Sequence, residues 1–156
     1  MPPRPPQAAP GRKKKPETTT TLDKQCLVLW GQIVKARDKV CRISGSSQSL
    51  SPHHIRSRGH ANTRFDLSNG MCLSWGIHRL QKLAPERFMD MVIECIGDEE
   101  YQRLKALSMK TRQRKIQDFR DERDRLRKEL VALSNQLENP PEIYDDLDRV
   151  LEECGL

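Results

Sequence analysis

The longest regular pattern in this 156-residue chain is a row of apolar residues near its C-terminal end. Gaps of three and four residues alternate along it, with one arginine among the members: Ile116, Phe119, Arg123, Leu126, Leu130, Leu133 and Leu137. Side chains at these gaps share one face of an α-helix, so the pattern predicts a long helix over 110–138 whose apolar stripe must be covered. Two alternatives cover it: a second copy, in a coiled-coil homodimer through residues 116–137, or the chain's own core.

Shorter helical patterns surround a central segment that is not helical in composition. Apolar residues at helical spacing predict a helix over 22–37, and three more follow after the centre, at 76–83, after Pro85 and from Asp98. The centre is rich in Gly and Ser and predicts two short strands, 50–55 and 70–75, joined by a polar loop over 56–68. The expected fold class is therefore α+β, mostly helical, with a small two-stranded unit flanked by helices and a long C-terminal helix.

Both ends of the chain differ from the middle. Five prolines in the first ten positions and the basic run 12–15 predict a disordered basic arm over 1–20, either a solvated tail or a loose tether to DNA. With 35% hydrophobic and 32% charged residues, we expect one small globular domain over 21–109. The helix over 110–138 and an acidic segment over 139–156 follow it.

Charge is distributed unevenly and points to a polyanionic partner. The net charge is +6, and seven basic residues oppose only Asp38 between positions 35 and 65. From Glu138 onward seven acidic residues oppose only Arg149, so DNA is expected to bind the middle of the chain and not its end. No apolar run approaches the roughly 20 residues that span a bilayer, which predicts no membrane partner and a cytoplasmic protein, in a bacterium or a phage-infected cell.

Histidines form the main functional signal. All four in the chain lie between positions 53 and 78. Hydrolysis of a phosphodiester needs a base for the attacking water and a cation for the departing oxygen, and imidazole can act as base or metal ligand near neutral pH. Adjacent residues of a strand point to opposite faces, so His53 and His54 are expected to divide these tasks.

These residues resemble a known motif. The series His53-His54-Ile55, Asp66-Leu67-Ser68-Asn69-Gly70-Met71-Cys72-Leu73 and Gly76-Ile77-His78-Arg79-Leu80 is similar to the HNH (ββα-metal) nuclease motif. Fifteen positions separate His54 from Asn69 and nine separate Asn69 from His78, which suits the family's order of strand, loop, strand and helix. The resemblance covers about residues 40–83. The loop 56–60 with Arg64-Phe65 is also similar to phage recombination endonucleases of the NinG type.

The resemblance implies a role for each motif residue. His53 and His78 are expected to bind one divalent metal ion, and His54 is the expected general base. Asn69 is expected to steady the loop and to orient His54 or complete the metal shell. Mg²⁺ is the expected ion, with Mn²⁺, Zn²⁺ or Ni²⁺ as alternatives, and cleavage is expected to leave a 5′-phosphate.

Further expectations concern charge, zinc and packing. The basic side chains Arg56, Arg58, Arg64 and Arg79 are candidates for nucleic-acid binding. Many relatives carry paired cysteines that hold a structural zinc, but here Cys41 is followed by Ser44, and the later pair is Ser74 and Ile77, so no structural zinc is expected. His60 is expected to be an exposed loop residue, and Leu73 and Trp75 to be core residues.

The sequence thus favours a metal-dependent HNH endonuclease that nicks or cuts DNA, with recombination intermediates as one class of substrate. A catalytically silent DNA-binding or interaction module of the same fold is the main alternative. A coiled-coil adaptor, in which the helix over 110–138 dominates the behaviour, is the third.

Overall fold

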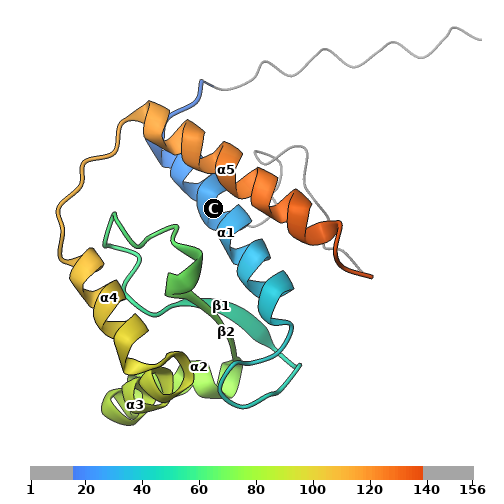
Figure 1. Cartoon of the computed structure of the whole chain (residues 1–156), viewed down its shortest axis with the longest axis vertical. Coiled ribbons are helices and arrows are strands. Elements are labelled where there is room, and N and C mark those ends of the chain that lie inside the picture. The colour runs from blue at the N-terminus through green and yellow to red at the C-terminus, as the bar shows by residue number, and fades with distance from the viewer. Residues whose placement is uncertain (1–15, 139–156) are drawn as a thin grey trace, which may run out of the picture.

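The computed structural model describes residues 16–138, and the predictions for 1–15 and 139–156 lie outside this range (Figure 1). Helices predominate, and one small antiparallel sheet lies among them, which agrees with the expected α+β class. The elements in chain order are α1 (Thr19–Asp38), β1 (Leu50–His54), the 3-10 helix η1 (Leu67–Asn69), β2 (Gly70–Ser74), α2 (Trp75–Leu83), α3 (Pro85–Ile96), α4 (Asp98–Ser108) and α5 (Ile116–Ser134).

Helix α1 begins inside the stretch that was predicted to be a disordered arm. Thr18 caps its start, because the Thr18 hydroxyl oxygen accepts a hydrogen bond from the backbone N–H of Thr21 at 3.1 Å. The helix ends at Lys39, which adopts a left-handed conformation with φ 60°. The last two residues of the predicted arm, Thr19 and Thr20, are therefore helical.

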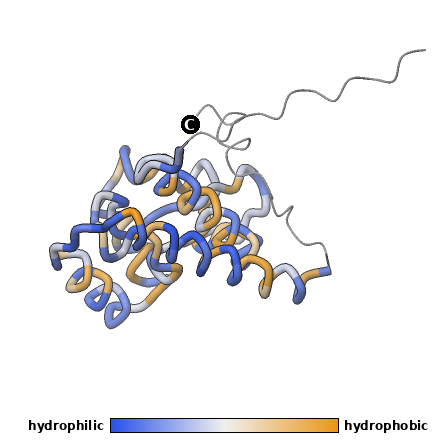
Figure 2. The backbone as a smooth tube through the Cα atoms, turned by 90° about the horizontal axis from the view of Figure 1, so that it is seen from above, coloured by the Kyte–Doolittle hydropathy of each residue, from blue (hydrophilic) through white to orange (hydrophobic). Residues whose placement is uncertain are grey.

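The apolar stripe of α5 is covered by α1 of the same chain. The two helices lie side by side and begin at the same end of the molecule, where Glu17 pairs with Arg120 and Arg123 (Figure 1). Leu126 and Leu130 are fully buried in a core formed with these residues: Cys26, Leu29, Trp30, Ile33, Val34, Phe65 and Cys72. Figure 2 shows how apolar residues recur along the helices of this bundle. Of the two alternatives for the stripe, the structure shows intramolecular packing.

The sheet separates this core from a second one. Strand β2 pairs with β1 so that His53 lies opposite Met71 and His54 lies opposite Gly70. On β2, Cys72 faces the α1–α5 core, while Met71 and Leu73 face a second core with α3 and α4. Because both faces of β2 are covered, its residues Gly70 to Leu73 are all buried, and the two faces of β1 open toward different halves of the molecule.

The end of α1 holds β2 in place. The Arg37 guanidinium donates hydrogen bonds to the carbonyl oxygens of Leu67 and Gly70 at 2.8 and 2.7 Å. The Asp38 carboxylate accepts one from the backbone N–H of Cys72 at 2.8 Å. Gly70 and Cys72 belong to β2, and their bonded groups point away from β1, so these contacts position the β1–β2 hairpin against α1.

Trp75 was expected to be a core residue at the end of the second strand, and that prediction is wrong. Trp75 is the first residue of α2 and is 61% exposed, whereas Leu73 is fully buried as predicted. Ile77 and Leu80 pack against the second core, and at 100° per residue this turns Trp75 to the opposite side of the helix. None of the helices among residues 16–138 combines the length and apolar character needed to cross a membrane.

Candidate functional site

The alternation of β1 separates the two adjacent histidines. His53 and Ser51 face α2 and α3, where the rings of His53 and Phe88 meet edge to face at 5.3 Å. His54 faces α1 and stacks on Trp30, with ring centroids 3.7 Å apart and planes inclined by 12°. His53, the predicted metal ligand, and His54, the predicted base, thus lie in separate environments on the two faces of β1.

His53 and His78 form a close pair between β1 and α2. The Nδ1 atom of His53 lies 3.2 Å from Nε2 of His78, and Nδ1 of His78 lies 3.2 Å from the Ser51 hydroxyl. Burial, and then the neighbouring His78 and His54, lower the pKa of His53 to about 4. His53 is therefore neutral near pH 7, the form in which imidazole binds a metal ion.

The spacing of these two nitrogens fits one metal ion. At a metal–nitrogen distance of about 2.0–2.1 Å, two ligands at tetrahedral to octahedral angles lie roughly 2.9–3.4 Å apart. The 3.2 Å between His53 Nδ1 and His78 Nε2 falls in this range. Within the described residues no third His, Cys, Asp or Glu joins them. A bound ion would therefore keep most of its positions for water and phosphate oxygen.

The contacts of His54 determine which of its nitrogens can accept a proton. Its Nε2 lies 2.9 Å from the carbonyl oxygen of Arg64. A carbonyl can only accept, so Nε2 carries the hydrogen and Nδ1 is the unprotonated nitrogen of the neutral ring. Burial lowers the pKa of His54; the Arg64 carbonyl opposes this, and the charges of Arg64 and Arg58 add to it. His54 is thus a neutral, oriented base.

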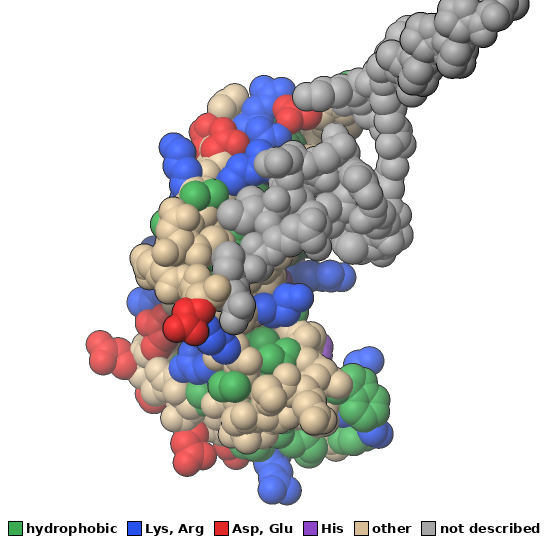
Figure 3. Space-filling view, turned by 90° about the vertical axis from the view of Figure 1, so that its right-hand side faces the viewer, with side chains coloured by type: hydrophobic (Ala, Val, Ile, Leu, Met, Phe, Trp, Pro, Cys, Tyr) green, Lys and Arg blue, Asp and Glu red, His purple; other side chains and the backbone are tan. Residues whose placement is uncertain are grey.

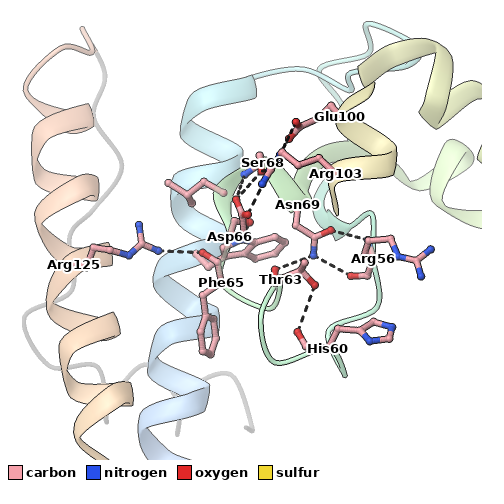
Figure 4. Close-up of polar contacts among 12 residues, drawn as sticks. Arg56, His60, Thr63, Phe65, Asp66, Ser68, Asn69, Glu100, Arg103 and Arg125 are labelled. Atoms are coloured by element: carbon pink, nitrogen blue, oxygen red, sulfur yellow. Dashed lines mark hydrogen bonds and ion pairs between the residues drawn. The ribbon is translucent and has the colours of Figure 1, made fainter. Parts of the chain in front are cut away.

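Asn69 binds the loop that leads to the Arg64 carbonyl. Its Oδ1 accepts a hydrogen bond from the backbone N–H of Arg56 at 2.7 Å (Figure 4). Its Nδ2 donates to the carbonyl oxygens of Arg56 at 3.0 Å and Thr63 at 2.9 Å. The residue is fully buried, and none of these hydrogen bonds goes to an imidazole. Asn69 therefore acts on His54 through the loop backbone.

The predicted nucleic-acid-binding arginines differ in how far they are engaged within the protein. Arg64 forms an ion pair with Asp23 at 2.5 Å and donates to the Arg58 carbonyl, and Arg56 donates to Ser108 and Tyr101 at 3.2 and 3.3 Å. Arg58 is exposed, and no hydrogen bond or ion pair of its side chain occurs among the described residues. Arg79 lies over the ring of Trp75, 4.5 Å from its centroid. Arg58 and Arg79 are thus the more available of the set.

A pocket of about 510 Å³ opens beside His54. Its apolar walls are Leu27, Trp30 and Pro52, and its charged residues are Asp23, Lys24, Arg58 and Arg64. The combination of apolar walls and mainly basic charged residues suits part of a nucleic-acid strand placed next to His54. His60, which was expected to be exposed, is half-buried in the loop and lies outside this lining.

Three of the positions compared above with paired cysteines, Cys41, Ser44 and Ser74, form a polar cluster. The backbone N–H of Ser44 donates to Sγ of Cys41 at 3.4 Å, and the hydroxyls of Ser44 and Ser74 are 3.4 Å apart. One thiol and two hydroxyls replace the thiolates that a structural zinc site uses.

Sequence reasoning missed the supports of the site. Ser51 could have been found, because it lies two residues before His53 and so shares its face of the strand. Trp30 gave no signal beyond helical spacing, since its stacking on His54 depends on how α1 packs on the sheet. No model of a protein family, no curated protein and no solved structure matches this chain.

Proposed function

We propose that this chain is a metal-dependent endonuclease of the HNH type that hydrolyses DNA phosphodiesters. The observation that carries the proposal is the pair formed by His53 Nδ1 and His78 Nε2, 3.2 Å apart, next to a separately held His54. Two imidazole nitrogens spaced for one ion and a third imidazole oriented as a base are the groups that metal-assisted hydrolysis requires.

Each residue has a definite task in this mechanism. A divalent ion bound by His53 and His78 would supply Lewis-acid stabilisation of the departing oxygen. His54 Nδ1 accepts the proton of the attacking water, while the Arg64 carbonyl holds Nε2–H and stabilises the imidazolium that forms. The exposed Arg58 lies at the same pocket as His54 and can hold a phosphate of the strand.

The donor set bears on the choice of metal. Imidazole nitrogen suits Zn²⁺, Ni²⁺ and similar ions, whereas Mg²⁺ prefers oxygen ligands. The Mg²⁺ that the family resemblance favours would therefore be bound weakly by His53 and His78 alone. The cleavage test therefore needs Mn²⁺, Zn²⁺ and Ni²⁺ as well as Mg²⁺.

The test is cleavage of supercoiled plasmid by purified protein with Mg²⁺, Mn²⁺, Zn²⁺ or Ni²⁺, or with chelator. His54→Ala should abolish cleavage but still bind metal by calorimetry, whereas His78→Ala should lose both. His60→Ala is the matched control and should cut like the wild type. Cleavage that persists in chelator or in His54→Ala would refute the proposal.

A silent module of the same shape is the second candidate. It is favoured by the small number of protein ligands, since only two nitrogens meet at the pair within the described residues. In that case DNA would bind in every metal without being cut, and His54→Ala would leave DNA affinity unchanged.

A further inference from the structure

Helix α2 presents an aromatic and basic surface beside His78 that the mechanism above does not use. Trp75 is 61% exposed, and the Arg79 guanidinium lies 4.5 Å from its ring centroid. At 100° per residue, positions 75, 78, 79 and 82 fall on one side of the helix. Trp75, Arg79 and Lys82 therefore line the same side of α2 as the proposed metal ligand His78.

The charge of this surface favours a nucleic acid over another protein or an apolar partner. Helix α2 contains Arg79 and Lys82 and no acidic residue. At the level of α2, Figure 3 shows hydrophobic side chains adjoining Lys and Arg side chains, with the edge of a histidine beside them. An exposed indole bordered by cations is the combination that stacks bases and holds phosphates in single-strand binding sites.

The burial pattern explains why the indole is available. Ile77 and Leu80 are the α2 side chains that pack on the second core, so Trp75 makes no contribution to that core. Arg79 covers one face of the ring and leaves most of the residue in solvent. Removing bulk at position 75 should therefore leave the fold unchanged.

We infer that Trp75 and Arg79 form a base-stacking site for an unpaired nucleobase of the strand whose phosphate reaches His53 and His78. This inference rests on the proposed function for the identity of the strand. Within an intact duplex the bases are already stacked on one another, and reaching Trp75 would cost the unstacking of a base step. The site thus selects DNA that is single-stranded or locally unpaired near the scissile bond.

Intrinsic fluorescence provides a direct test, because the chain has only two tryptophans and Trp30 is 2% exposed. An oligothymidylate titrated into the full chain, in chelator so that nothing is cut, should quench tryptophan emission. A duplex of the same length should quench it much less. Trp75→Phe should remove most of the quenching, leaving only what Trp30 at the His54 pocket contributes, while single-strand binding, followed by anisotropy, persists.

The variant Trp75→Ala should weaken single-strand binding by roughly 5- to 150-fold, the range expected for one stacked base. Met109→Ala is the control, since Met109 is 73% exposed and lies outside α2. Unchanged affinity in Trp75→Ala, quenching in Trp75→Phe as strong as in the wild type, or equal quenching by duplex would each overturn the inference. Because no cleavage is involved, quenching without nuclease activity would refute the proposed function and leave the stacking site standing.

Discussion

Replacing Asn69 by alanine tests whether the loop between the two strands is held by this one side chain. Asn69 is fully buried and makes three hydrogen bonds to the backbone of Arg56 and Thr63. The methyl group of alanine can make none of them. The backbone N–H and carbonyl groups of a part-buried loop would then be left without these partners.

The expected loss of stability follows from the number of bonds. Each contributes about 1 kcal/mol net, and a buried group left without a partner costs about 1–3 kcal/mol, so the total is about 3 kcal/mol. For a domain whose whole stability is about 5–15 kcal/mol, this is a large fraction. With a denaturant slope near 1.5 kcal/mol per molar, the urea midpoint should fall by roughly 2 M.

The assay is urea unfolding followed by circular dichroism, with hydrogen exchange of the Arg56 amide as a local probe. Asn62→Ala is the matched control, because Asn62 lies in the same loop and makes a single exposed hydrogen bond, to the Lys110 carbonyl. It should cost less than about 1 kcal/mol. In Asn69→Ala, cleavage should also fall, while metal binding through His53 and His78 persists.

The reasoning about Asn69 would be refuted by a variant as stable as the Asn62→Ala control. Unchanged protection of the Arg56 amide would refute it equally. Loss of metal binding in a folded Asn69→Ala protein would show that the residue belongs to the metal shell after all.

Three further predictions concern packing and pH. Gly70→Ala should destabilise the fold by about 1–3 kcal/mol, because the added Cβ would lie 2.5 Å from Val34 and 2.7 Å from Trp30. Gly76→Ala in α2 should stabilise the fold slightly, because its Cβ would meet nothing within 4 Å. Thermal melts that rank the two variants otherwise would contradict this prediction. Leu130→Ala should cost about 2–5 kcal/mol in urea unfolding, against less than about 1 kcal/mol for the neighbouring exposed Val131→Ala. The pKa of His53 is about 4 in the folded protein and 6.5 when the side chain is exposed. The metal-free protein should therefore be most stable above about pH 6.5, and its free energy of unfolding should fall by up to about 3 kcal/mol as the pH falls to 4. A His53→Gln variant with the same loss of stability would rule out His53 as its source.

Local sequence patterns predicted most of the elements. The helical spacing in α1 and the Pro85 and Gly97 boundaries placed α1, α3 and α4 to within about three residues, whereas α5 is shorter at both ends than the predicted 110–138. Strand alternation predicted that His53 and His54 face opposite ways, because this depends only on two adjacent positions in one strand. These features could be predicted because each depends only on residues that are close together in the sequence.

Features that depend on tertiary packing could not be predicted in the same way. The sequence suggested a phosphate contact for Arg64 because of its positive charge. In the structure its guanidinium is paired with Asp23, which lies 41 positions earlier in the chain and so could not be identified as its partner. Trp75 was assigned to the core by its hydrophobicity, but the side of α2 that is buried depends on where Ile77 and Leu80 meet the second core. The partner of the α5 stripe was undecidable from the stripe alone.

Because the sheet lies between two cores, each core supports a different histidine of β1. Trp30, on which His54 rests, belongs to the core that α5 closes, whereas Phe88, which His53 contacts, belongs to the core of α3 and α4. Under the proposed mechanism, a substitution confined to the first core should impair proton transfer by His54 and leave metal binding intact. A substitution confined to the second core should weaken metal binding by His53 and leave His54 in position.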